Sequence, residues 1–297
     1  MTPYPAIAIY GRQFNDTVIP FVEELFDYLE SRKIKTYIHC NFLPFLQKQI
    51  RHIAPHPTFQ HVKELPEVAF MLSLGGDGTM LSAVSIVQDS GIPIAGINFG
   101  RLGFLANIEK TKISSSLNQI FEGEYALQSR TLLSITSQES ALFKKDNFAL
   151  NDITVFRHEN SSMITVDVKI NGELLNSYWA DGIIIATPTG STAYSLSCGG
   201  PIIMPGSGNF VITPVAPHNL NVRPIVVSSD MELEVEVKSR SSQYILSCDS
   251  KHTTLPTTAK LKIKEAPFKI NLIRLKNTSY FKTLQQKLLW GLDVRNY

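Results

Sequence analysis

Hydrophobic side chains in the first part of the chain follow two patterns, short apolar runs and helical spacing. Residues Ala6–Tyr10 and Ala69–Leu74 form nearly all-apolar runs, which predict buried parallel strands. Shorter apolar stretches at 35–39 and 92–97 predict two more strands. After the first run, residues 18–29 place their apolar side chains on one face of a helix. Strands that alternate with helices predict a mostly parallel sheet with both faces covered.

The pattern changes near Tyr125, after which strand signals follow one another without clear helices between them. Apolar and polar positions alternate over 163–170 and 232–237, and Asn171-Gly172 has the composition of a two-residue hairpin turn. A helix signal interrupts this region at 191–198. At the end of the chain, Phe281, Leu284, Leu288 and Leu289 share one helical face.

These patterns predict an α/β N-terminal domain with a mostly parallel sheet, followed by an antiparallel all-β C-terminal domain. We place the α/β domain at residues 1–125 and the β-rich domain at 126–270. Residues 271–297 form a closing segment whose helix is expected to return to the N-terminal domain and pack on it. Parallel sheets bind ligands beyond the carboxyl ends of their strands, so we expect the functional residues of this domain at that edge of the sheet.

Composition narrows the classes of partner. The chain has 297 residues, 43% of them hydrophobic, and a formal net charge of +2 with acids and bases interspersed, so neither nucleic acid nor a membrane surface is an expected partner. An apolar run of about eighteen residues, as a membrane helix needs, does not occur. Cys40, Cys198 and Cys248 are widely spaced and odd in number, which favours free thiols and a cytoplasmic location.

The five residues Gly75-Gly76-Asp77-Gly78-Thr79 join a predicted buried strand to a predicted helix. A helix start presents free backbone N–H groups to an anion, and glycines let a phosphate approach the backbone closely. A carboxylate repels phosphate, so Asp77 is interpreted as a base for a hydroxyl nucleophile or as an outer partner of Mg²⁺. The turn therefore predicts phosphoryl transfer to an alcohol, and an ordinary Asp-containing turn is the alternative.

A second constellation lies at Ala180–Pro201 in the β-rich region. An apolar strand ends in a Pro/Gly turn, and the helix predicted after it opens with Ser191-Thr192, whose hydroxyls are expected to cap it. Tyr194 is placed to stack on a base, and Ser197 lies on the next turn of the same helix. Taken alone, the segment also fits a capped helix that plugs a β-sandwich.

Together the two segments resemble the NAD kinase family. Further similarity lies at Asn98–Leu105, Ala149–Asp152 and Pro214–Leu220, and in the closing stretch 287–291. The resemblance covers roughly residues 70–297. Its most specific part is the stretch 187–195, because diacylglycerol, sphingosine and phosphofructo-kinases share the glycine turn.

The resemblance implies ATP-dependent phosphorylation of NAD at the 2′-hydroxyl of its adenosine ribose, giving NADP and ADP. Asp77 would accept the hydroxyl proton, while the phosphates would be lined by Gly75, Gly76, Gly78 and Thr79. The residues implied to bind NAD are Asp77, Gly78, Asn151, Asp152, Asp181, Thr192, Ala193, Tyr194 and Ser197. The family also implies Mg²⁺ or another divalent cation bound with ATP, no metal site made by the protein itself, and a homodimer or homotetramer.

Two positions depart from the family pattern. Asp152 stands where the family usually has Glu, so the carboxylate reaches one methylene less far. Lys251 lies in Cys248–Lys251, which replaces a frequent Asp-Gly-Gln, and its ammonium group is expected to face solvent. For Asn151 and Asp152 the structural alternative is a turn between strands, and for Asp181 it is a turn at a strand start.

Two other functions compete with NAD phosphorylation. A lipid kinase would share the glycine turn, but the Tyr194 segment and the lack of a basic amphipathic helix argue against it. A non-catalytic NAD(P) sensor would not need a carboxylate at position 77. His52, His56 and His61 cluster in sequence around prolines, and we expect solvent-exposed loop histidines there rather than a metal site.

Overall fold

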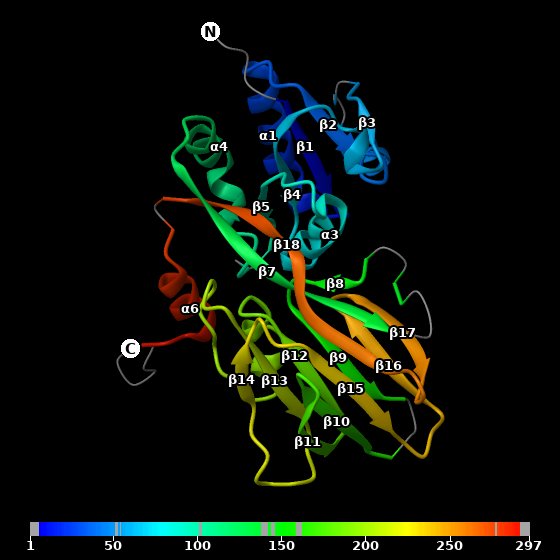
Figure 1. The fold of residues 1–297 in the computed structure, drawn as a ribbon. Helices are drawn as coiled ribbons and strands as arrows, with labels where there is room; N and C mark the ends of the chain where they lie inside the picture. Colours follow the sequence, from blue (N-terminus) through cyan, green and yellow to red (C-terminus); the bar gives the residue numbers. More distant parts are fainter. Residues whose placement is uncertain are drawn as a thin grey trace. The chain divides into compact units, whose positions relative to one another are not determined.

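The computed structural model describes residues 6–50, 53, 55–100, 103–137, 142–143, 146–158, 162–276 and 278–291. The chain divides into two compact units, drawn in Figure 1. The α/β unit contains the residues up to Gln128 together with those from Asn271 onward, and the β unit is Ser129–Ile270. The two boundaries between the units fall inside the long strands β7 (Tyr125–Ser137) and β18 (Leu261–Leu275).

The α/β unit is built on a parallel sheet in the order β5-β4-β1-β2-β3, with β6 and the end of β18 pairing with β5. Its strands are β1 (Ala6–Gly11), β2 (Thr36–His39), β3 (Thr58–Phe59), β4 (Val68–Leu74), β5 (Ile94–Asn98) and β6 (Ile108–Glu109). Its helices are α1 (Ile19–Ser31), α2 (Leu43–Gln49), α3 (Asp77–Val87), α4 (Ile113–Phe121) and α6 (Tyr280–Leu288), with 3-10 turns at Asp16–Val18, Val62–Glu64 and Lys110–Lys112. The strand and helix patterns of the sequence are confirmed with shifts of one or two residues.

The core of this unit follows from the sequence pattern. The apolar face of α1 is buried at Val22, Leu25, Phe26 and Leu29, as its helical spacing predicts. Strand β4 is buried along nearly its whole length because helices cover both faces of a parallel sheet. The closing helix α6 uses its apolar face only in part, since Leu284 is buried while Phe281 and Leu289 are 63% exposed.

The carboxyl ends of three neighbouring strands meet at one edge of this sheet. Gly11 at the end of β1 pairs with Leu74 at the end of β4, and Leu74 pairs in turn with Ile97 of β5. The glycine turn begins directly after Leu74 and therefore lies at the edge where parallel sheets bind ligands.

The β unit consists of antiparallel strands, in two groups. One is a six-stranded sheet in the order β14-β13-β12-β9-β16-β17, and the other runs β11-β10-β15-β18. The bounds are β8 (Phe148–Ala149), β9 (Asp152–Arg157), β10 (Ile164–Ile170), β11 (Glu173–Ala180), β12 (Gly182–Ala186), β13 (Asn209–Val215), β14 (Ile225–Ser228), β15 (Leu233–Lys238), β16 (Gln243–Cys248) and β17 (Lys251–Pro256). The predicted fold class, a mostly parallel α/β part, an antiparallel β part and a C-terminal helix, is confirmed.

The hairpin predicted at Asn171-Gly172 joins β10 and β11, and both turn residues have positive φ, 50° and 85°. The helix predicted over 191–198 is wrong as a single element. A 3-10 turn at Gly190–Thr192 precedes a one-turn helix α5 (Tyr194–Ser197), and Ala193 between them has a non-helical backbone, with φ −100° and ψ −128°. Among the helices that the structure describes, none combines the length and apolar character needed to cross a membrane.

Candidate active site

The glycine turn requires a glycine at its first position, Gly75. Gly75 has φ +151°, and a Cβ there would overlap the side chain of Thr79. Gly76 is the N-cap of α3, and its carbonyl accepts the N–H groups of Thr79 (3.0 Å) and Met80 (3.1 Å). In the described part of the chain, the N–H groups of Gly76, Asp77 and Gly78 have no partner. N–H groups without a partner at a helix start attract anions, which fits the predicted phosphate-binding role.

Asp77 is the first residue of α3, and its carboxylate is held by a separate loop of the same unit. Oδ2 accepts the N–H of Phe104 (2.8 Å), while Oδ1 accepts those of Leu105 (3.1 Å) and Ala106 (3.0 Å). A Cβ at Gly103 would overlap the same carboxylate, so this loop approaches Asp77 through a glycine. The loop belongs to the segment Asn98–Leu105 that resembles the family, although Arg101 and Leu102 lie outside the described residues.

In the β unit, Leu150 and Asn151 form the bend between β8 and β9, and Asp152 is the first residue of β9. These three residues, called the Leu150–Asp152 turn below, are hydrogen-bonded to the segment 187–190. Thr187 donates its Oγ1 hydrogen to the carbonyl of Leu150 (2.5 Å) and its N–H to that of Asn151 (2.9 Å). A Cβ at Gly190 would overlap the Asn151 carbonyl. Two of the stretches that resemble the family, 149–152 and 187–190, therefore pack directly on each other.

Asp249 also holds the Leu150–Asp152 turn by hydrogen bonds. The Asp249 carboxylate accepts the N–H groups of Leu150 (2.8 Å), Asn151 (2.9 Å) and Asp152 (3.2 Å). In return, the N–H of Asp249 donates to the carbonyl of Asp152 (3.0 Å). Sequence reasoning gave Asp249 no role, because its partners lie about a hundred residues earlier in the chain.

Asp152 and Asp249 form a pair of buried carboxyl groups. Burial, together with the Asp249 charge, raises the pKa of Asp152 to about 7, and a hydrogen bond from the Thr154 hydroxyl (3.2 Å) opposes this. Burial also raises the pKa of Asp249, although its three backbone donors favour the charged form.

The other predicted NAD-binding residues lie around β12 and α5. Asp181 stands at the end of β12 opposite to the one that pairs with Asp152, and it accepts a hydrogen bond from Arg157 Nε (2.7 Å). Tyr194 is 43% exposed, and Ser197, three residues later in the same turn of α5, is also exposed. Thr192 and Ala193 are half-buried next to them.

The predicted capping of this helix by hydroxyl groups is wrong. Ser191 Oγ bonds to the carbonyl of Pro188 (2.7 Å) and accepts the N–H of Ile203 (2.9 Å), and Thr192 Oγ1 donates to the carbonyl of Thr189 (3.1 Å). Neither short helix has a side-chain cap, because both hydroxyls are used to close the turn before it. Tyr194 and Ser197 keep their exposed positions despite this difference.

The expectation that Lys251 faces solvent is also wrong. Its ammonium group donates to the carbonyl of Asp146 (2.9 Å) and lies 5.1 Å from the centre of the Phe148 ring. Lys251 thus stabilises the segment before β8.

The prediction that the histidines at positions 52, 56 and 61 are solvent-exposed is wrong for His56. His56 packs against Phe26 with ring centres 5.5 Å apart, so it is half-buried rather than solvent-exposed, and burial lowers its pKa. His61 is exposed as predicted, and His52 lies outside the described residues. Within the described ranges, no group of three or more His, Cys, Asp or Glu is placed to hold a metal ion.

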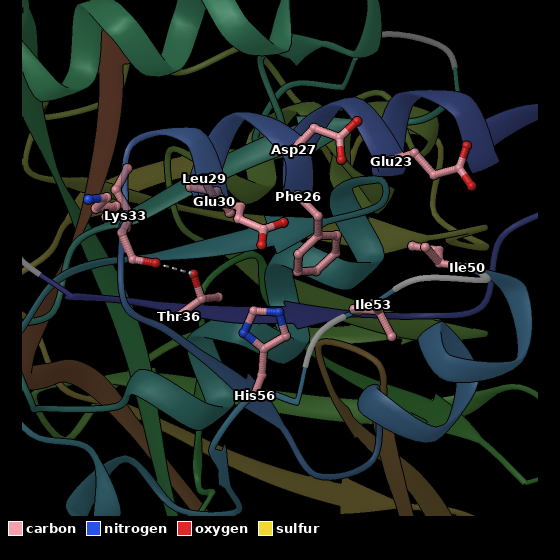
Figure 2. A pocket seen from close by; sticks show the side chains of 11 residues that line it. Glu23, Phe26, Asp27, Leu29, Glu30, Lys33, Thr36, Ile50, Ile53 and His56 are labelled. Carbon is pink, nitrogen blue, oxygen red and sulfur yellow. Dashed lines mark hydrogen bonds between the residues drawn. The ribbon is translucent and has the colours of Figure 1, made fainter.

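His56 and Phe26 line a pocket of about 470 Å³ between α1 and the segment that follows α2. Figure 2 shows their rings facing each other inside it, with Glu23, Asp27 and Glu30 on the α1 side. None of the predicted site residues lines this pocket, so it is separate from the glycine turn.

Solved structures define the class of protein. The yeast NADH kinase complexed with NADH has the same fold, with a TM-score of 0.85 over 98% of this chain and 89% of that one, at 22% identity. An NAD kinase from Archaeoglobus fulgidus in complex with ATP aligns over 96% of this chain and 98% of that one, with a TM-score of 0.74 and 25% identity. The fold of this chain is therefore the one that these NAD(H) kinases share.

Sequence comparisons then identify the family. Residues 8–125 match the ATP-NAD kinase N-terminal domain, and residues 150–275 match the ATP-NAD kinase C-terminal domain. The NAD kinases of Cytophaga hutchinsonii and Flavobacterium psychrophilum are 44% and 45% identical to this chain, over 97% and 98% of its length and 99% of theirs. The chain belongs to the ATP-NAD kinase family.

Proposed function

We infer that this protein transfers the γ-phosphoryl group of ATP to the 2′-hydroxyl of the adenosine ribose of NAD, giving NADP and ADP. Membership of the ATP-NAD kinase family supports both substrates. The observation that carries the inference within this chain is the carboxylate of Asp77, held in one orientation at a glycine turn with free N–H groups.

Asp77 is the proposed catalytic base. A carboxylate offers about four acceptor positions, and three of them are taken by the loop at Phe104–Ala106. Oδ2 accepts only one of these bonds, so it is the oxygen that can accept the proton of the ribose hydroxyl. A positioned base of this kind contributes about 10²–10⁴ to the rate.

Positioning and charge neutralisation supply most of the remaining acceleration in phosphoryl transfer. The free N–H groups of Gly76, Asp77 and Gly78 are proposed to hold phosphate oxygens, and Gly75 and Thr79 fix the shape of the turn that presents them. Mg²⁺ is proposed to be bound mainly by ATP oxygens and water. When bound there, Mg²⁺ neutralises charge on the phosphates.

The β unit is proposed to bind NAD. Asn151 and Asp152 would contact the ribose and pyrophosphate side. The exposed ring of Tyr194 would stack on a base, with Ser197, Asp181, Thr192 and Ala193 around it. The exposure of Tyr194 and Ser197 on one turn of α5 supports this placement.

We also propose a homodimer or homotetramer, in which a neighbouring subunit completes the site. Edge strand β11 supports this, because it exposes the large apolar side chains of Leu174 (55%) and Trp179 (49%) at the end of its sheet. A cytoplasmic location is proposed from the thiols of Cys40, Cys198 and Cys248, which form no disulfide. Light scattering of the purified protein measures the oligomer directly.

The activity is tested by incubating purified protein with ATP, Mg²⁺ and NAD and measuring NADP. We expect NADP in proportion to enzyme and time. Binding of NAD without formation of NADP would favour the non-catalytic sensor. Phosphorylation of a diacylglycerol but not of NAD would favour the lipid kinase. The family membership favours neither of these alternatives.

A further inference from the structure

The hairpin turn between β16 and β17 reaches across to the turn that carries Asn151 and Asp152. Asp249 occupies this hairpin turn with φ +51°, a left-handed conformation that few side chains other than Asp and Asn adopt readily. Four hydrogen bonds join the two turns, three to the Asp249 carboxylate and one from its own N–H. The backbone from Leu150 to Asp152 is thereby fixed at three consecutive N–H groups.

The contact places two carboxyl groups in the same buried part of the β unit, where three backbone N–H groups and Lys251 favour the charged form of Asp249. The carboxyl of Asp249 is buried beside that of Asp152, and like charges at a buried site repel. The other titratable groups around it are the buried thiol of Cys248, Lys251 and Asp146. Lys251 is the cation among them, and it already donates to the carbonyl of Asp146.

A carboxylate has one property that a neutral side chain lacks here. It can accept all three N–H groups at once, whereas an asparagine in the same place would direct its NH₂ group toward at least one of these donors. The charge therefore specifies one geometry for the Leu150–Asp152 turn.

We propose that Asp249 is a positioning residue for NAD, which fixes the Leu150–Asp152 turn so that Asn151 and Asp152 present their side chains to the nucleotide. The inference rests on the proposed function, since it concerns the NAD side of the same site. Asp77 provides a parallel within this chain, because its carboxylate also accepts three consecutive backbone N–H groups from a distant loop.

The test uses the full-length variant Asp249→Asn. We expect the KM for NAD to rise at least tenfold, because the turn loses one or more of its anchors, while the KM for ATP changes less than twofold. The pH at which NAD affinity changes should also move downward, since Asp152 would no longer lie beside a second carboxyl group. A merely structural contact would lower thermal stability without separating the two KM values.

The matched control is Asn171→Ala. Asn171 is also a hairpin-turn residue of the β unit with positive φ, and its Oδ1 accepts the N–H of Glu232 (3.0 Å). This variant removes a hairpin-turn contact to Glu232, which is not a proposed site residue, so both KM values should stay at the wild-type level. An unchanged KM for NAD in folded Asp249→Asn would overturn the proposal.

If Asp249→Asn does not fold, the proposal is tested by measuring backbone amide hydrogen exchange in the wild-type protein. Protected amides at Leu150, Asn151 and Asp152 without NAD support the proposal, and exchange as fast as in an open loop contradicts it. A wild-type protein that forms no NADP would instead contradict the proposed function, and the exchange result would remain interpretable by itself.

Discussion

Gly103 lies so close to Asp77 that a methyl group on Gly103 would overlap the Oδ1 atom of the carboxylate. The following three residues donate their N–H groups to the same carboxylate. The glycine thus sets how near the loop comes to the proposed catalytic base, and the base in turn holds the loop.

Replacing Gly103 by alanine should displace the Asp77 carboxylate and reduce kcat. We expect a loss of about 10²-fold or more, the range for a mispositioned base, with NAD binding retained. The control is Gly100→Ala in the same segment, where the nearest atom to a new Cβ is Asn98 Oδ1 at 3.8 Å. Equal kcat values for the two variants would show that the Gly103 contact does not position the base.

Asp77→Asn should abolish measurable turnover while NAD still binds. The amide cannot accept the ribose proton, and its NH₂ group would face at least one backbone donor of the Phe104–Ala106 loop. Steady-state rates and calorimetric titration with NAD separate the two effects, with the exposed Asp89→Asn as a control. Near-normal turnover in Asp77→Asn would exclude Asp77 as the base.

Tyr194→Ala should weaken NAD binding, and Tyr194→Phe should not. Stacking of a base on an aromatic ring is worth about 1–3 kcal/mol, so the alanine variant should lose roughly 5- to 150-fold in affinity. Since the ring is 43% exposed, its removal should leave the fold and the melting temperature nearly unchanged. If the alanine variant binds NAD as tightly as the phenylalanine variant, the ring has no stacking role.

NAD affinity should depend on pH near neutrality. The pKa of Asp152 is about 7, and the ionised carboxylate is the better acceptor for ribose hydroxyl groups. We therefore expect the Kd for NAD, measured without ATP, to fall as the pH rises through this range. Asp152→Asn should make the Kd nearly independent of pH, and an unaltered pH profile in this variant would assign the titration to another group.

Stability should follow the opposite trend. The pKa of Asp152 in the folded protein, about 7, is above the ordinary value of 3.8, so the folded state binds the proton more tightly between these two values. This contribution to the free energy of unfolding is fully present below pH of about 4 and is lost as the pH rises through about 7. Chemical denaturation of wild type and Asp152→Asn between these pH values measures it.

The sequence predicted those parts of the fold that depend on local periodicity. The apolar face of α1, the buried strand β4 and the Asn171-Gly172 hairpin all follow from residues close together in the chain. The helix at 191–198 was predicted wrongly because the Ser191 hydroxyl finds a partner at Ile203, outside the local window.

The sequence predicted which residue types form the site, but not the hydrogen bonds that hold them in place. The glycine turn and the Tyr194 segment carry recognisable motifs, which family resemblance connects. The anchoring of Asp77 by the loop after Gly103, and of the Leu150–Asp152 turn by Asp249, depends on contacts over 27 to 99 residues of sequence. Long-range contacts of this kind leave no periodic signal.

Because the Phe104–Ala106 backbone holds the Asp77 carboxylate by hydrogen bonds, a change in this loop alone can move the proposed base. A small molecule that pulled this loop aside would strip the carboxylate of all three donors and let it rotate, without entering the nucleotide site. Inhibitor design could therefore target the loop instead of the nucleotide site.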